Sequence, residues 1–239
     1  MPKSIRKSTL RRGAAGRATV RTRAAGDARS SLRRRPIQHR GDTRLQAVLD
    51  AAELVIAEVG VEAATTNAIA ARAGSGMGSL YRFFPNKQAI VDALAERYMA
   101  AMRPLTLYME RPQLATMPVA RMVDAIVDPL IEFFRRSPAY RHVFHTTNQP
   151  GAPSRPCEAM KEAVVSHVDG LMAARAPKLP AAERRVHAEV AVELVHGMLG
   201  VAFEKPAHQR APYLLEAKRL LALYAEMVQS GDDPLRRLR

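Results

Sequence analysis

A helical repeat of apolar residues is the feature of this sequence that most constrains its fold. The first clear series comprises Leu45, Val48, Leu49, Ala52, Val55, Ile56 and Val59. Steps of three and four positions place these side chains on one face of an α-helix. Asp42 or Thr43 can cap the start of this helix and Gly60 can end it, so we expect a helix over about 43–59.

The helical period returns along most of the chain, and no segment shows the alternation of a β-strand. The expected helices are one after Thr65, one at about 77–84, a long one at about 87–103, and others at about 119–134, 138–146, 157–175, 182–204 and 211–229. Pro129 should kink one of them, and a loop with three prolines should span 147–156. Tryptophan is absent and aromatic residues are only 5%, which disfavours sheet-rich folds. The predicted fold class is therefore all-α.

The net charge of +14 is concentrated in the first part of the 239-residue chain. Residues 1–40 hold 13 Lys or Arg and one acid, Asp27, whereas the other 199 residues hold 24 basic and 22 acidic residues. The first segment has few apolar residues, so we expect a disordered basic tail over 1–41. Three explanations stay open: a nucleic-acid-binding arm, a start codon assigned too early, or a transit peptide. The segment lacks the apolar core of a secretory signal.

Several classes of protein and site are disfavoured by the composition. No apolar run approaches the roughly 18 residues of a membrane span, and the single cysteine, Cys157, excludes a disulfide scaffold. His142 and His145 are three residues apart with His167 downstream, but nothing fixes their convergence, so we predict no metal. We find no phosphate loop, zinc-protease motif or nucleophile elbow, so we predict no enzyme and no cofactor.

Residues 65–87 carry the pattern of a helix-turn-helix, whose second helix enters the major groove of DNA. Thr65 and Thr66 stand at a helix N-terminus, where backbone N–H groups favour phosphate. Gly78 and Ser79 are small, which allows the backbone of the second helix to approach the DNA closely.

The far end of the second helix supplies polar side chains. Tyr81, Arg82 and Lys87 offer a hydroxyl and two charges that suit phosphate contacts. A plain helical domain is the alternative interpretation, in which Tyr81 packs internally and Arg82 lies on a solvated face.

Two stretches, TTNAIAARAG at 65–74 and GSLYRFFPNK at 78–87, resemble the DNA-binding domain of TetR/AcrR-family transcriptional regulators. The resemblance covers about residues 43–95, and the remainder is similar only in length and helical architecture. It implies a three-helix helix-turn-helix DNA-binding domain at 42–87 and a helical ligand-binding and dimerisation domain at 88–230. A C-terminal tail would follow at 231–239.

The resemblance also assigns roles to single positions. In the family, a threonine at the start of the second helix contacts phosphate, small residues before Leu-Tyr approach bases, and the tyrosine and a lysine clamp the DNA backbone. The residue after the tyrosine, here Arg82, is a candidate for guanine or phosphate contact. The predicted DNA-binding residues are Thr65, Thr66, Asn67, Ser75, Gly78, Ser79, Tyr81, Arg82 and Lys87.

Two departures from the family pattern concern the turn and the recognition helix. The usual Ala-Gly-Val-Ser turn is replaced by Ala73-Gly74-Ser75-Gly76, so either Ser75 caps the next helix or the turn is looser. Phe83 occupies a position often held by His or Tyr and cannot make a polar contact. The first residue of the recognition helix is therefore left open by the sequence.

Family members are homodimers that bind near-palindromic operators, with half-sites about 34–36 Å apart. The resemblance places the dimer surface on the last two long helices, where Gly197 and Gly200 allow close approach. The apolar stripes there comprise Val190, Leu194, Val195, Met198, Val201, Tyr213, Leu214, Ala217, Leu220, Leu221, Tyr224 and Val228. An intramolecular core would give the same stripes.

The family's C-terminal domain also holds a small-molecule cavity. The candidate lining residues are Met99, Met102, Met122, Ile126, Phe133, Tyr140 and Phe144, although each could simply fill the core. We therefore predict a cytoplasmic, sequence-specific DNA-binding regulator, a repressor that a small, largely apolar effector releases from a double-stranded DNA operator. The alternative is an architectural nucleic-acid-binding protein that relies on the Arg-rich tail.

Overall fold

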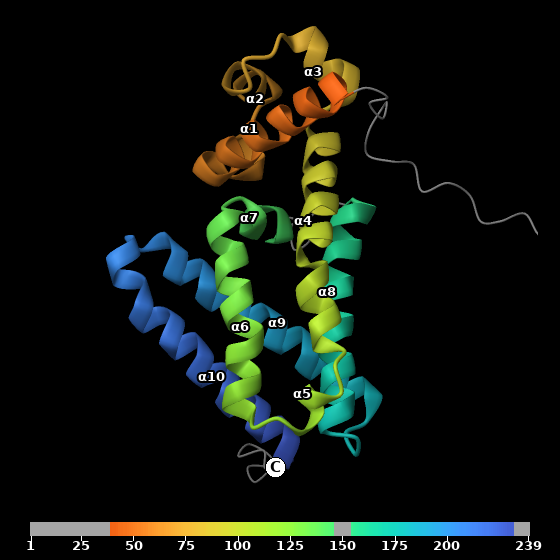
Figure 1. Ribbon diagram of the computed structural model, residues 1–239, viewed down its shortest axis with the longest axis vertical. Coiled ribbons are helices and arrows are strands. Elements are labelled where there is room, and N and C mark those ends of the chain that lie inside the picture. The colour runs from red at the N-terminus through yellow and green to blue at the C-terminus, as the bar shows by residue number, and fades with distance from the viewer. Residues whose placement is uncertain (1–38, 146–153, 232–239) are drawn as a thin grey trace, which may run out of the picture. The chain divides into compact units, whose positions relative to one another are not determined.

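The computed structural model describes residues 39–145 and 154–231, where the chain is helical and contains no strand. The elements in Figure 1 are α1 (His39–Ala63), α2 (Thr66–Arg72), α3 (Met77–Phe83), α4 (Lys87–Met109), α5 (Gln113–Thr116), α6 (Val119–Arg136), α7 (Tyr140–His145), α8 (Arg155–Arg175), α9 (Ala181–Glu204), the 3-10 turn η2 (Ala207–Gln209) and α10 (Arg210–Ser230). The all-α prediction is confirmed. The basic tail and its three explanations lie outside the described residues.

Helix α1 follows the predicted stripe up to its last turn. Gly60 has a φ of 78°, which an L side chain adopts only with strain, and it ends the regular helix before a short turn to Ala63. Val59 is 51% exposed, contrary to the expectation that it faces the core. The stripe fails there because the last turn of α1 lines a shallow surface pocket, which Val59 shares with His142.

Four other features differ from the sequence expectation. Helix α1 begins at His39, so Asp42 and Thr43 lie inside the helix and not at its start. Helix α4 continues through Pro104 to Met109, and the short helix α5 was not anticipated. Helix α8 begins at Arg155 inside the predicted proline loop, because proline is tolerated in a first helical turn, where its missing N–H has no partner to lose. The Ser154 hydroxyl accepts a hydrogen bond from the Cys157 N–H at 3.5 Å. Residues 146–153 of that loop lie outside the described residues. Helix α6 is assigned as continuous through Pro129.

Helices α1, α2 and α3 form a small unit around a shared apolar core. Ile69 of α2 and Leu80 of α3 are fully buried, and Phe84 closes the core just after α3. Helix α4 starts at Lys87 and runs from this unit into the helical bundle (Figure 1). The predicted domain boundary at 87/88 thus falls on the first turn of a continuous helix.

The bundle comprises α4, α6, α8, α9 and α10. Helix α8 packs against α4 and α9, and α10 packs against α9 and α6. By length and composition alone, α9 is apolar enough to cross a membrane, which the sequence reading did not anticipate. In the bundle, however, eight of its residues are buried, so its composition also fits a core helix shared between two packing faces.

Candidate nucleic-acid interface and internal cavity

The two threonines at the start of α2 have different structural roles. The Thr65 hydroxyl accepts a hydrogen bond from the Ala68 N–H at 3.1 Å, so Thr65 is the N-cap. Thr66 is the first helical residue, and its Oγ1 lies 3.3 Å from the hydroxyl of Tyr81 on α3. Asn67 follows and is exposed. The structure therefore brings together Thr66 and Tyr81, two predicted phosphate contacts.

The recognition helix α3 begins at Met77 without a side-chain cap. The Ser75 N–H donates to the Ala70 carbonyl at 2.9 Å, so Ser75 belongs to the end of α2 and does not cap α3. Gly78 is exposed and Ser79 is half-buried in the first turn. A Cβ at Gly78 would meet no atom of the described residues within 4 Å, so packing among them does not require glycine there.

The rest of α3 separates packing from polar side chains. Leu80 and Phe83 are buried, whereas Tyr81 and Arg82 are exposed. The Arg82 guanidinium lies 5.1 Å from the centre of the Phe83 ring and forms no ion pair with any residue that the structure describes. Arg82 is therefore a cation held on an aromatic face and free to contact an anion.

Lys87 has a structural role that the sequence did not reveal. Its ammonium donates to the carbonyl oxygens of Val61 and Glu62, each at 2.8 Å. These bonds satisfy carbonyl groups at the end of α1 and fix the start of α4 against it. An ammonium has three donors, so one remains for a phosphate.

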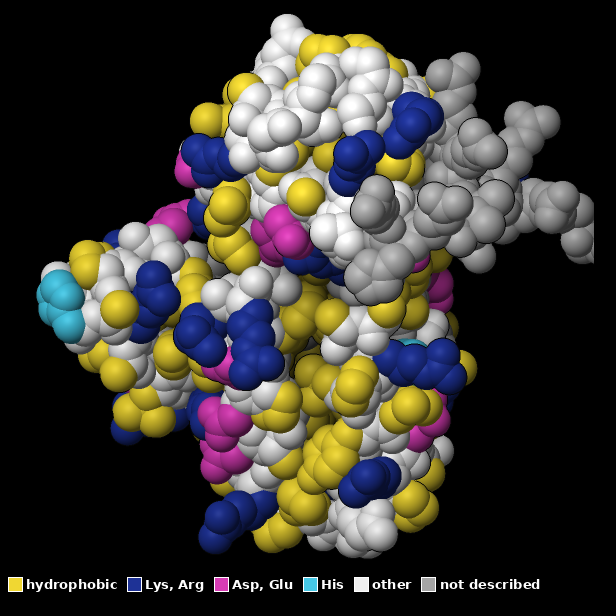
Figure 2. All heavy atoms as spheres, turned by 45° about the horizontal axis from the view of Figure 1, so that its top comes forward, with side chains coloured by type: hydrophobic (Ala, Val, Ile, Leu, Met, Phe, Trp, Pro, Cys, Tyr) yellow, Lys and Arg dark blue, Asp and Glu magenta, His cyan; other side chains and the backbone are white. Residues whose placement is uncertain are grey.

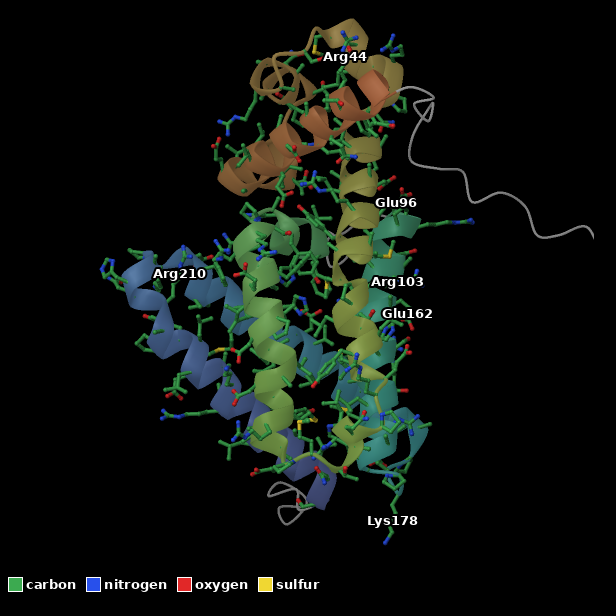
Figure 3. All side chains as sticks on the ribbon, in the orientation of Figure 1. Arg44, Glu96, Arg103, Glu162, Lys178 and Arg210 are labelled. Atoms are coloured by element: carbon green, nitrogen blue, oxygen red, sulfur yellow. The ribbon has the colours of Figure 1, made fainter. Side chains whose placement is uncertain are left out.

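Two other cations of this unit differ in whether they form an ion pair with a described residue. Arg72 forms two hydrogen bonds to Glu58, at 2.6 and 2.9 Å, which tie α2 to α1. Arg44 extends from the first turns of α1 and forms no ion pair with a described residue (Figure 3). Arg44 was not among the DNA-binding residues predicted from the sequence. Figure 2 shows the face of α1–α3 with Lys and Arg side chains at its margins.

A cavity of about 110 Å³ lies within the bundle. Helices α4, α6, α8, α9 and α10 all contribute to its lining, which is apolar except for Thr106, Arg175, His196 and Gln229. Of the predicted effector residues, Met102, Met122 and Ile126 line it. Figure 2 shows hydrophobic side chains gathered on the face between α4 and α6.

The other four predicted pocket residues do not line this cavity: Met99, Phe133, Tyr140 and Phe144. The three aromatic residues pack with Tyr98 and His196. The Tyr140 ring meets Phe133 edge-on at 4.7 Å, and Phe144 stacks on His196 at 4.1 Å between ring centres. Large rings in such contact fill their own space, so this layer of the bundle is solid.

His196 joins the cavity to the aromatic layer. Its side chain is buried, and its Nδ1 lies 2.7 Å from the Val192 carbonyl oxygen, so Nδ1 carries the proton. Its Nε2 then accepts from the Tyr140 hydroxyl at 3.0 Å. Burial lowers the pKa of His196 to about 4, so the ring is neutral at neutral pH.

A second polar contact joins α4 to α1. The Tyr98 hydroxyl donates to the Glu53 carboxylate at 3.0 Å, and Arg97 donates to the same carboxylate at 3.0 Å and to Asp50 at 2.6 Å. Burial raises the pKa of Glu53, with smaller opposing effects from Tyr98 and Arg97. The Tyr98 ring contacts the Tyr140 ring edge-on at 5.4 Å. Polar and aromatic contacts therefore continue from the cavity to α1.

Helices α9 and α10 carry exposed apolar residues on their outer faces. They are Val186, Val190 and Val201 on α9, and Tyr213, Leu215, Leu220 and Leu223 on α10. Among the predicted dimer residues, Val195, Ala217 and Val228 are instead buried in the bundle, and Leu194, Met198, Leu214, Leu221 and Tyr224 are half-buried. Gly197 is exposed and Gly200 is buried. The apolar stripes of α9 and α10 therefore contain both residues buried in the bundle and residues exposed on its surface.

His142 and His145 line the shallow pocket beside Val59 and Gly60. The described residues hold no group of three or more side chains placed to bind a metal ion.

Two family models match the chain. One, described as bacterial regulatory proteins of the tetR family, matches residues 48–94, and the other, described as tetracyclin repressor-like, C-terminal domain, matches residues 118–224. The first match contains α2 and α3, and the second covers α6 to most of α10.

Known proteins extend the comparison. A nucleoid occlusion factor SlmA from Haemophilus ducreyi is 34% identical over 90 residues, which are 38% of this chain and 43% of that protein. The chain thus matches less than half the length of these curated relatives. A TetR-family transcriptional regulator from Streptomyces coelicolor is 25% identical, with a TM-score of 0.53 over 77% of this chain and 99% of that one. The regulator LfrR from Mycobacterium smegmatis, solved with proflavine, is 21% identical, with a TM-score of 0.55 over 75% and 95%.

Proposed function

The chain is a TetR-family DNA-binding transcriptional regulator, and from this premise we propose that it is a repressor released from its operator by a small molecule. The observation that carries the proposal is the division of α2 and α3 into a buried and an exposed side. Leu80 and Ile69 pack inward, while Thr66, Tyr81 and Arg82 present hydroxyls and a charge outward. We assign no catalytic role and expect the protein to act in the cytoplasm, where it meets DNA.

The contacts proposed for DNA fall into two groups. Thr66 and Tyr81 lie close enough to hold one phosphate between their hydroxyls. Lys87, six residues after Tyr81, has one ammonium N–H left to donate to the DNA backbone. Gly78, Ser79 and Arg82 lie on α3 and would face the major groove, where arginine can pair with guanine. The first group positions the protein and the second supplies sequence preference.

The cavity is the proposed effector site. Its apolar lining suits a largely apolar molecule, and one structural neighbour, LfrR, was solved with proflavine. The path by which binding would reach α1 starts at His196 in the cavity wall. From there it passes through Tyr140 and Tyr98 to Glu53. A shift of α4 that broke the Tyr98–Glu53 hydrogen bond would move the DNA-binding unit of one subunit relative to that of the other subunit in a dimer.

Homodimerisation through α9 and α10 is part of the proposal. The exposed valines of α9 and leucines of α10 supply the apolar surface that a stable interface needs. A two-fold dimer would carry two recognition helices, so the operator should contain inverted half-sites about 34–36 Å apart.

Selection of bound fragments from genomic DNA by the full-length protein tests the proposal. We expect one enriched motif with inverted half-sites, and repression of a reporter placed behind it. The double variant Tyr81→Phe/Arg82→Ala is the matched control, because both side chains are exposed and their loss should leave the fold intact. Binding without any enriched sequence would exclude a sequence-specific regulator and favour an architectural role.

A further inference from the structure

Among the described residues that line the cavity, Arg175 is the one charged side chain, and the other polar residues are Thr106, His196 and Gln229. It lies in the last turn of α8, and its Nη1 donates to the carbonyl oxygens of Leu114 and of Met117, the latter at 2.9 Å. Its Nη2 donates to the Gln229 side-chain oxygen on α10 at 3.0 Å. The guanidinium therefore meets three neutral acceptors at the end of the cavity away from His196.

Arg175 has no carboxylate partner among the residues that the structure describes. Most other buried or half-buried cations of the bundle are paired, such as Arg184 with Asp169 and Lys218 with Asp124. A guanidinium has five N–H donors, and the bonds to described residues use three of them, which leaves the Nε–H and one Nη2–H. Burial lowers the pKa of Arg175, but an arginine in a protein stays protonated. An unpaired charge beside apolar side chains favours an anion.

The place of Arg175 also fits the entry of an amphipathic molecule. Arg175 is half-buried and Gln229 is exposed, so this end of the cavity reaches solvent. From Val164 to Arg175 the lining follows α8 for eleven positions, a length of about 16 Å. A ligand could thus keep a charged head at the mouth while its tail lies among apolar side chains.

We propose that the effector is an amphipathic monocarboxylic acid, whose carboxylate pairs with Arg175 and whose apolar tail lies along the cavity toward His196. The inference rests on the proposed function and names the chemical class of its ligand. Carboxylates match the planar fork of a guanidinium, and such charged pairs are stronger than bonds to neutral acceptors. The cavity, at about 110 Å³, is smaller than the ~150 Å³ that holds benzene, so a longer acid must spread the helices. Spreading would displace α4, which leads to the DNA-binding unit.

Three eight-carbon probes of different head-group charge test the inference on the wild-type protein. Octanoate, 1-octanol and octylamine share a tail and carry a negative, a neutral and a positive head at pH 7.5. By calorimetry we expect octanoate to bind about tenfold or more tightly than either of the others, as a charged hydrogen-bonded pair predicts. Equal binding of octanol, or tighter binding of octylamine, would overturn the inference, as would no binding of octanoate.

Two variants locate the head group. In Arg175→Gln the preference for octanoate over octanol should fall to below about threefold, whereas Arg175→Lys keeps the charge and should retain part of it. If Arg175→Gln is too unstable to measure, Arg175→Lys still tests the inference, because lysine lacks the planar guanidinium. An octanoate-over-octanol preference that stays unchanged in Arg175→Lys would contradict pairing of the carboxylate with this residue. Calorimetry needs no operator. Failure of DNA selection with a retained octanoate preference would sink the repressor proposal alone, whereas operator binding with no acid preference would sink the ligand class alone.

Discussion

The Tyr98 hydroxyl donates to the Glu53 carboxylate at 3.0 Å, and this bond joins the long helix α4 to the first helix of the DNA-binding unit. Both side chains are buried, and Arg97 holds the second carboxylate oxygen at 3.0 Å. A buried carboxylate tolerates little loss of its partners, because water cannot replace them. The contact is therefore costly to break and well placed to report a movement of α4.

Replacing Tyr98 with phenylalanine should weaken the effect of effector binding on operator affinity. The variant removes the Tyr98 hydrogen bond from a buried carboxylate, so we expect a loss of about 1–3 kcal/mol in the free energy of unfolding, measured with urea. The ratio of operator affinities without and with effector should fall toward one, measured by fluorescence anisotropy. Tyr108→Phe on the same helix is the control, since the Tyr108 hydroxyl bonds to no described residue. An unchanged affinity ratio in Tyr98→Phe would show that coupling takes another route.

His196 should make the protein sensitive to acid. Burial lowers its pKa from 6.5 to about 4, so between these values the unfolded chain binds more protons than the folded one. The free energy of unfolding should keep its full value above pH 6.5 and fall as the pH drops to 4, by up to roughly 3 kcal/mol. His196→Gln removes this titration and should give a flatter profile from a lower starting value. Burial also lowers the pKa of His142, and that contribution stays in both proteins. Parallel profiles for the two proteins would contradict the assignment.

Lys87 and Arg82 should respond differently to substitution. Lys87→Met loses two bonds to the end of α1, so we expect about 1–3 kcal/mol lower stability together with weaker binding to all DNA sequences. Arg82→Ala removes an exposed side chain and should leave stability within about 0.5 kcal/mol. If Arg82 reads a base, its loss relaxes the preference at one operator position and costs about 1–3 kcal/mol there. Binding to a panel of single-base operator variants, with urea unfolding alongside, checks both. Full stability of Lys87→Met would mean that the carbonyl contacts carry little energy.

The sequence predicted what depends on neighbours along the chain. The cap at Thr65 and the end of α1 at Gly60 were readable, because a cap and a positive φ require particular residues within one turn. The family pattern identified α2 and α3 for the same reason. The bonds from Lys87 to Val61 and Glu62 were not readable, since they join positions about 25 residues apart.

The cavity shows a second limit of sequence patterns. Ile126 and Phe133 are seven residues apart on α6 and share one face, yet only Ile126 lines the cavity. Helical periodicity predicts which face of the helix a residue occupies, but it does not predict the residue's position along the bundle axis. In this bundle one layer contains the cavity and the next layer is filled by aromatic rings. Arg175 was missed because a lone arginine near a helix end gives no signal until the helices that surround it are known.

The outer faces of α9 and α10 should mediate dimerisation. Leu223 is 63% exposed on α10, and a glutamate there would bring a charge into the apolar interface. We expect Leu223→Glu to be monomeric by light scattering at concentrations where the wild type is dimeric, with much weaker operator binding. Leu107→Glu on α4 is the matched control, because Leu107 is 49% exposed and lies on another helix. A dimeric Leu223→Glu protein would place the interface elsewhere.

Removal of the basic tail should alter affinity more than specificity. Residues 1–40 carry a net charge of +12, whereas the predicted base contacts lie on α3. If the tail engages about five phosphates per subunit, it adds roughly −4.5 to the slope of log K against log salt. We expect the truncated protein to keep its preferred operator sequence while losing that part of the slope. A full-length variant with glutamine in place of the tail's Lys and Arg separates charge from length and should behave like the truncation. Equal slopes for all three proteins would show that the tail does not contact DNA, and loss of operator preference on truncation would favour the architectural alternative.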